Sequence, residues 1–181
     1  MWPKVFLLLA LVPTFVHSLA ATDEIQDADP AQSGYMDNHN MHPSTVGSAI
    51  FGQLWKNFYG NNKEKWYAKP LVYTPPGQSQ LVFLASSMNI IRTVDAVNGT
   101  LLNQRTVQPP FLQSDIGCTD IPDYIGIVVG PWSTETGCLR MLIYFQGTPI
   151  IDPNTNTVFF FSKGYKNGAS NGGVANGEWR L

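Results

Sequence analysis

The most regular strand pattern in the chain lies in residues 88–107. The β-branched side chains at positions 90, 91, 93 and 94 favour a pleated, half-buried backbone, and residues 101–107 resume an apolar, strand-like run. Between the two runs, Asn98-Gly99 is a pair that readily adopts positive φ and is a strong signal for a hairpin turn. The pattern therefore predicts two antiparallel strands joined by a turn.

Two shorter apolar runs precede this hairpin, at residues 67–73 (YAKPLVY) and 81–85 (LVFLA). Residues 74–78 (TPPGQ) separate them, and their prolines and glycine interrupt regular structure. Residues 66–107 thus hold four predicted strands in 42 residues, which is the size of one β-propeller blade of roughly 40–45 residues. We predict that residues 66–107 form one full blade, a twisted four-stranded antiparallel sheet.

The segment before this blade is less regular. Residues 44–59 are apolar and aromatic, and Gly47 and Gly52 interrupt a helical period. A single strand is therefore favoured over a short helix capped by Ser44. The charged and amide-rich residues 61–65 are predicted to form a solvated turn.

The segment after the blade predicts a second, partial blade over residues 147–181. Its first hairpin occupies residues 147–165, with Phe159, Phe160 and Phe161 packing on both faces of a buried strand, and residues 178–181 begin a further strand. The predicted fold is all-β: an incomplete β-propeller domain over residues 44–181 with about one and a half four-stranded antiparallel blades. Since propellers use roughly four to eight blades, such a chain cannot close a ring alone.

A family resemblance accompanies this pattern. Residues 92–102 (RTVDAVNGTLL) resemble the repeat of quinoprotein-type propellers, and wider similarity covers about residues 35–127 and 147–181, including FGQLWK and GTPIIDPNTNTVFFFSKGY. The chain is similar to a group of secreted, mostly fungal proteins with a quinoprotein-alcohol-dehydrogenase-like propeller. In that repeat a tryptophan four residues after the glycine packs between blades, whereas this chain has Asn103 there.

The N-terminus predicts secretion. Residues 1–20 have the features of a signal peptide: Lys4, an apolar run over residues 5–16, and small-residue cleavage patterns ending at Ser18 and Ala20. That run is too short to span a bilayer, which takes roughly 20 residues. We expect an extracellular chain without a membrane partner after cleavage, in which residues 21–43 form a polar flexible leader or an extended arm.

Charge and secretion constrain partners and modifications. The net charge of −2 comes without a Lys/Arg cluster, so nucleic-acid binding is not expected. Asn98-Gly99-Thr100 is an N-glycosylation sequon on the predicted turn, and we expect Asn98 to be modified. Secretion also permits disulfides, and the only two cysteines, Cys118 and Cys138, allow one intrachain bridge.

Two polar clusters suggest metal chemistry but are better explained otherwise. His39 and His42 have a spacing that converges on a helix, but Pro43 and the asparagine-rich flank argue against a helix here. Residues 114–123 carry three carboxylates (Asp115, Asp120 and Asp123), which in pairs bind Ca²⁺ or act as acid and base. A connecting loop, whose carboxylates accept from local backbone N–H groups, is favoured.

A third cluster mimics the opening of a Ca²⁺ loop, with Asp152, Asn154 and Asn156 at alternate positions. The match fails because Thr157 replaces the required glycine and Lys163 replaces the bidentate glutamate. We predict a turn here. No metal ligand and no catalytic residue is assigned anywhere in the chain, since no nucleophile has a recognisable base.

Residues 128–146 (VVGPWSTETGCLRMLIYFQ) interrupt a junction that related propellers pass through as IGIxGTPxID. The 19 residues correspond to 57 nucleotides, a multiple of three, and a valine codon begins with GT while a glutamine codon can be CAG. We hypothesise a retained intron, and RNA reads joining residue 127 or 128 directly to 147 would support it. The alternative is a surface insertion, which a Cys118–Cys138 bridge in the secreted protein would establish.

Three functions follow as expectations. The first is a secreted propeller fragment with a non-catalytic binding or scaffold role, whose ligand is a carbohydrate or a protein. The second is a truncated gene product without a function. The alternative from another class is a quinone-dependent oxidoreductase acting on alcohols or sugars, which the resemblance implies by fold analogy and which needs pyrroloquinoline quinone (PQQ) with Ca²⁺; its cofactor-binding residues are not identified.

Overall fold

The computed structural model describes residues 23–25, 29, 31, 33–36, 42–49, 51–117, 122–127 and 148–181. These residues form a β-rich structure with one short α-helix, α1 (Pro43–Val46), and three 3₁₀ turns, η1 (Gln113–Asp115), η3 (Lys166–Gly168) and η4 (Val174–Asn176). The strands are β1 (Leu71–Tyr73), β2 (Leu81–Ala85), β3 (Ile90–Asp95), β4 (Leu101–Thr106), β5 (Phe111–Leu112), β6 (Tyr124–Ile125), β7 (Ile150–Asp152), β8 (Thr157–Phe159), β9 (Ser162–Tyr165) and β10 (Gly177–Arg180). The signal segment 1–20 and the segment 128–146 lie outside the described residues.

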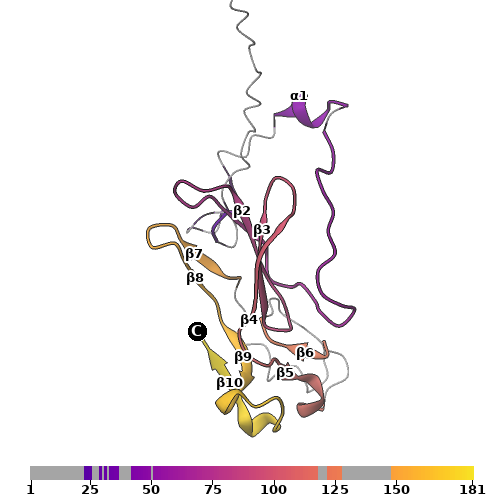
Figure 1. Ribbon diagram of the computed structural model, residues 1–181, viewed down its shortest axis with the longest axis vertical. Coiled ribbons are helices and arrows are strands. Elements are labelled where there is room, and N and C mark those ends of the chain that lie inside the picture. The colour runs from indigo at the N-terminus through magenta and orange to yellow at the C-terminus, as the bar shows by residue number, and fades with distance from the viewer. Residues whose placement is uncertain are drawn as a thin grey trace, which may run out of the picture.

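The central unit is a four-stranded antiparallel sheet in the order β1-β2-β3-β4, so each strand pairs with the next one in the chain (Figure 1). The sheet predicted for residues 66–107 is confirmed. A register shift between Thr93 and Val94 marks a bulge. The partners of Thr93 and Val94 are Asn103 and Leu101, so the extra residue of this bulge lies on β4. All six residues of β4 are exposed, and it is an edge strand of this sheet.

The period-two alternation of the strands gives the sheet two different faces. The register Leu71–Phe83–Thr93 places one set of side chains on one face, and Val72–Val82–Val94 places the next set on the other. Leu71, Tyr73, Phe83 and Ala85 of the first face form the buried core together with Ala68, Ile127 and Ile151.

A hairpin of β7 and β8 packs against this core. Ile151 is buried in the core, and the Phe160 ring lies 6.2 Å from that of Phe83. Burial of apolar surface stabilises the contact by about 25 cal/mol per Å² removed from water. Of the hairpin predicted for residues 147–165, the part formed by β7 and β8 is confirmed, whereas residues 162–165 belong to another sheet.

The phenylalanine run after this hairpin was predicted to be buried on both faces, and that is wrong. Strand β8 ends at Phe159, which is 46% exposed, and Phe161 is 49% exposed, so only Phe160 packs inward. The chain then leaves the hairpin, and β9 pairs with the C-terminal strand β10 as a separate two-stranded sheet. Residues 148–181 therefore form two small sheets rather than one.

The strand predicted for residues 44–59 is also wrong. A short helix, α1, begins at Pro43, and His42 rather than Ser44 is its N-cap, because the His42 ring accepts from the Ser44 N–H. Proline suits the first helical position, where its missing N–H has no partner to lose. Of residues 51–59, none has strand pairing.

The polar leader contacts two strands through Asp23 and Glu24. Asp23 and Val72 exchange two backbone hydrogen bonds of 2.7 and 2.9 Å, and the Asp23 carboxylate lies 2.7 Å from Lys69 Nζ. The Glu24 carbonyl accepts from Ile151 N–H. Of the two interpretations of residues 21–43, a flexible leader or an extended arm, the extended arm describes Asp23 and Glu24.

The fold class is all-β with antiparallel sheets, as predicted. The described residues contain one four-stranded sheet and three two-stranded ones, none of which closes into a ring. Across the same part of the chain, we find no helix long and apolar enough to cross a membrane.

Candidate binding groove

An extended segment, residues 55–59, lies over the turn between β3 and β4. Its alternate side chains donate to carbonyls of that turn: Trp55 Nε1 to Ala96 O at 2.9 Å, Asn57 Nδ2 to Gly99 O at 2.5 Å, and Tyr59 Oη to Gly99 O at 2.6 Å. This segment has the period of a strand, but side chains rather than a backbone ladder attach it to the sheet.

Hydrogen bonds within the turn and the conformation of Gly99 fix the carbonyls that accept from these donors. Asp95 N–H donates to Thr100 O at 2.8 Å, and the Asp95 carboxylate accepts from the N–H groups of Val97 and Asn98. Gly99 has φ +72° and is buried. A Cβ at Gly99 would lie 2.6 Å from both Trp55 Cε3 and Asn57 Nδ2, so the close approach requires glycine.

Beside this attachment lies an open groove of about 390 Å³ on the second face of the sheet. We call it the aromatic groove, because four of its lining side chains are aromatic. Phe58 is 87% exposed and Trp66 39% exposed. The lining residues are Trp55, Asn57, Phe58, Tyr59, Trp66, Ala68, Pro70 and Leu84.

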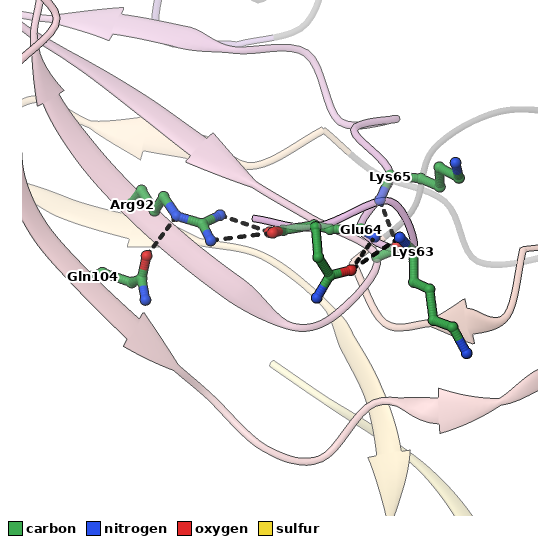
Figure 2. Close-up of polar contacts among 7 residues, drawn as sticks. Lys63, Glu64, Lys65, Arg92 and Gln104 are labelled. Carbon is green, nitrogen blue, oxygen red and sulfur yellow. Dashed lines mark hydrogen bonds and ion pairs between the residues drawn. The ribbon is translucent and has the colours of Figure 1, made fainter. Parts of the chain in front are cut away.

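A buried ion pair holds one wall of the aromatic groove. Arg92 Nη1 lies 2.6 Å from Glu64 Oε1 and Arg92 Nη2 lies 3.1 Å from Glu64 Oε2, while Arg92 Nε donates to Gln104 Oε1 at 2.6 Å (Figure 2). The two charged side chains are 3% and 1% exposed. Figure 2 shows Lys63 and Lys65 extending away from the pair, so within this charged run Glu64 alone turns inward.

The same guanidinium contacts two groove aromatics. Arg92 Cζ lies 5.1 Å from the centre of the Trp66 ring and 5.9 Å from that of Tyr59, both within the range of a cation–π contact. Arg92 therefore links the sheet to both rings, and Glu64 neutralises its charge. The solvated turn predicted for residues 61–65 is wrong at Glu64, because its partner lies on β3.

The chemistry of the aromatic groove suits binding. Among the described residues that line it, none carries a carboxylate, imidazole, thiol or amine, so it offers no acid–base pair. It offers flat apolar rings together with the amide of Asn57 and the hydroxyl of Tyr59. Ligand pockets combine such apolar walls with a few polar groups, and their volumes run from about 300 to 1,000 Å³.

Two residues singled out from the sequence, Asn98 and Asn103, lie on the β3–β4 turn and on β4. Asn98 is exposed on the turn that the segment 55–59 contacts, and its Oδ1 accepts from Thr100 N–H at 2.8 Å. Asn103, where the resembling repeat has its tryptophan, lies on the opposite face of the sheet. There it lines a second open pocket of about 240 Å³ together with Phe83, Ile91, Thr93 and Arg105, among others.

The acidic loop is tied to the C-terminal region. The Tyr165 hydroxyl donates to the Asp115 carboxylate, which also accepts from Gly173 N–H at 3.1 Å. These hydrogen bonds, that of Tyr165 first, lower the pKa of the Asp115 carboxyl below its ordinary value. Burial, followed by the Asp115 carboxylate, raises the pKa of Tyr165 to about 12. Asp115 is thus structural, as the loop interpretation expected, but its partners are distant in sequence rather than local.

The other polar candidates lie apart from the groove. Asp123 is 3.6 Å from Lys63 in an exposed ion pair, and His42 caps α1. The turn predicted at Asp152 is confirmed, since its carboxylate accepts from Asn154 N–H at 3.0 Å and Thr155 Oγ1 at 2.7 Å. His39, Cys118, Asp120 and Cys138 lie outside the described residues.

The aromatic groove itself was not anticipated from the sequence. A clue was present: Trp55, Phe58 and Tyr59 lie within five residues, and Trp66 follows. The ion pair between Glu64 and Arg92 has no such local signal, because 28 residues separate the partners. Comparison of the chain with protein-family models, with curated proteins and with solved structures found no match.

Proposed function

We propose that this chain is a secreted, non-catalytic binding protein of the quinoprotein-like propeller type, and that its aromatic groove binds a neutral carbohydrate. The observation that carries this proposal is the groove lining, in which Trp55, Phe58, Tyr59 and Trp66 surround an open volume of about 390 Å³. The signal peptide predicted for residues 1–20 supports this proposal, because a secreted protein meets free glycans.

The chemistry of a sugar matches this lining. One face of a pyranose ring carries mainly C–H groups, which pack against an aromatic ring, while its hydroxyl groups point outward toward polar partners. Asn57 and Tyr59 supply such partners. None of the described lining residues is charged, which favours a neutral ligand over an anionic one. Lys56, whose Nζ lies 5.1 Å from the centre of the Phe58 ring, is a cation beside the groove and not part of its lining.

The ion pair supports this function indirectly. Arg92 contacts both the Tyr59 and Trp66 rings, and its bonds to Glu64 and Gln104 fix its position. Rings held in advance lose less conformational freedom when a ligand binds, which favours affinity.

The test is an array of neutral oligosaccharides probed with the secreted protein and two matched variants. Phe58→Ala removes an aromatic ring that is 87% exposed and lines the groove, whereas Phe159→Ala removes one that is 46% exposed and does not line it. We expect Phe58→Ala to weaken binding about tenfold, or about 1.4 kcal/mol, and Phe159→Ala to leave it unchanged. No binding to any neutral glycan, or equal losses in both variants, would overturn the proposal.

A further inference from the structure

The turn that carries the N-glycosylation sequon is bonded directly to the aromatic groove. Trp55, Asn57 and Tyr59 all line the groove, and their polar atoms donate to the carbonyls of Ala96 and Gly99. Asn98 lies between these two carbonyls in the chain. Since consecutive Cα atoms are about 3.8 Å apart, the attachment residue lies next to the groove's own hydrogen-bonding partners.

Asn98 is presented for modification at this place. It is exposed, and its Oδ1 accepts from Thr100 N–H at 2.8 Å, which orients the side-chain amide. Gly99 is buried against Trp55 and Asn57, so the turn is fixed on the groove side and open at Asn98.

We propose that the N-linked glycan of Asn98 folds back into the aromatic groove and acts there as a ligand in cis, competing with free carbohydrate. This inference rests on the proposed function, since it needs a groove that accepts sugar. In the attachment step the anomeric carbon of the first N-acetylhexosamine replaces one hydrogen on Asn98 Nδ2. The bond to the lipid-linked pyrophosphate donor breaks, and the lipid pyrophosphate leaves with the proton.

The attached glycan competes with free oligosaccharide because its covalent link to Asn98 keeps it near the groove. A ligand held by a short flexible link has an effective concentration of about 1 mM. Against a dissociation constant of about 100 µM, that concentration reduces the apparent affinity for free oligosaccharide about tenfold. Glycosylation would thereby regulate the groove without any change of fold.

The test compares Thr100→Ala, which destroys the sequon, with Thr100→Ser, which keeps it. Thr100 is exposed, and its hydrogen bonds to Asp95 and Asn98 use only its backbone, so both variants retain the turn. Mass spectrometry of the secreted proteins establishes the glycan on Asn98. NMR then measures contacts between sugar protons and the indole rings of Trp55 and Trp66, and a titration with a neutral oligosaccharide measures affinity.

We expect sugar–indole contacts in the Thr100→Ser protein and about tenfold tighter binding of free oligosaccharide by the Thr100→Ala protein. If both proteins bind free oligosaccharide equally and no contacts appear, the inference is wrong while the proposed function stands. If neither binds free oligosaccharide, the sugar–indole contacts alone decide: their presence supports a cis ligand, and their absence overturns it. An unmodified Asn98 in the Thr100→Ser protein also overturns it.

Discussion

Arg92 and Glu64 form a bidentate ion pair in which the two side chains are 3% and 1% exposed, although 28 residues separate them in the chain. Desolvating two charges is costly, so such a pair is sensitive to the loss of one partner. Because Arg92 also contacts Tyr59 and Trp66, the pair couples stability of the sheet to the shape of the aromatic groove.

Removing one charge of this pair should destabilise the protein strongly. We expect Glu64→Gln to lower the free energy of unfolding by about 3–5 kcal/mol, because the Arg92 charge remains buried without a counter-ion. The control is Asp123→Asn, which breaks the exposed pair with Lys63 and should cost about 0–1 kcal/mol. Urea unfolding measures both, and equal small losses would show that the Glu64 pair is not buried in solution.

Replacing Gly99 should cost more than replacing a glycine with the same backbone strain. Gly99 and Gly77 have φ of +72° and +71°, so Gly99→Ala and Gly77→Ala both incur about 1–2 kcal/mol for the left-handed conformation. Only at Gly99 would a Cβ meet Trp55 and Asn57, whereas nothing lies within 4 Å of one at Gly77. Thermal unfolding should therefore show a larger loss for Gly99→Ala, and equal losses would mean that the segment 55–59 does not rest on the turn.

Alkaline pH should destabilise the fold through Tyr165. Its pKa is raised from 10.0 to about 12 in the folded state, so the folded protein holds this proton more tightly than the unfolded chain. The resulting stability is complete below pH 10 and is lost as pH rises toward 12.

The measurement is the free energy of unfolding between pH 8 and pH 12, and Tyr165→Phe should remove part of the alkaline decline. Burial also raises the pKa of Tyr67 and lowers the pKa of Lys163, so both groups contribute to the pH dependence of stability. Both are present in the two proteins, so the difference between the two pH profiles reports Tyr165 alone. Identical pH profiles would show that the pKa of Tyr165 is not raised in the folded protein.

Quinone chemistry should be absent from the 181-residue chain. The described groove lining has no carboxylate to act as a base, and Asn103 departs from the resembling repeat. We expect no reduction of an electron-acceptor dye by alcohols or sugars after addition of PQQ and Ca²⁺. Stoichiometric PQQ binding with turnover would refute this.

The central sheet was predictable because its signals are local. The four β-branched residues of β3, the Asn98-Gly99 pair and the proline-rich break before β2 all act within a few residues. The groove depends on distant partners instead. Glu64 sits in a run of charged and amide side chains that is solvated in most proteins, and only Arg92 on the folded sheet explains its burial.

Two predictions, the strand over residues 44–59 and the burial of residues 159–161, were wrong because a local pattern does not show which other part of the chain a segment contacts. The strand over residues 44–59 was predicted because Gly47 and Gly52 interrupt a helical period, but residues 55–59 attach to the turn through side-chain hydrogen bonds rather than a backbone ladder. A short apolar run such as residues 159–161 does not say which of its faces is covered, and here the hairpin ends at Phe159 and leaves two of the three rings exposed.

The most direct test of carbohydrate binding is an NMR titration of the indole N–H resonances with a neutral oligosaccharide chosen from the array, using the Thr100→Ala protein to avoid an attached glycan. Trp55 and Trp66 line the aromatic groove, whereas Trp179 lies beside Lys163, whose Nζ is 5.3 Å from the centre of its ring. We predict saturable shifts of the Trp55 and Trp66 resonances with no shift of Trp179. Unchanged Trp55 and Trp66 resonances at saturating oligosaccharide, or equal shifts of all three, would contradict carbohydrate binding in the groove.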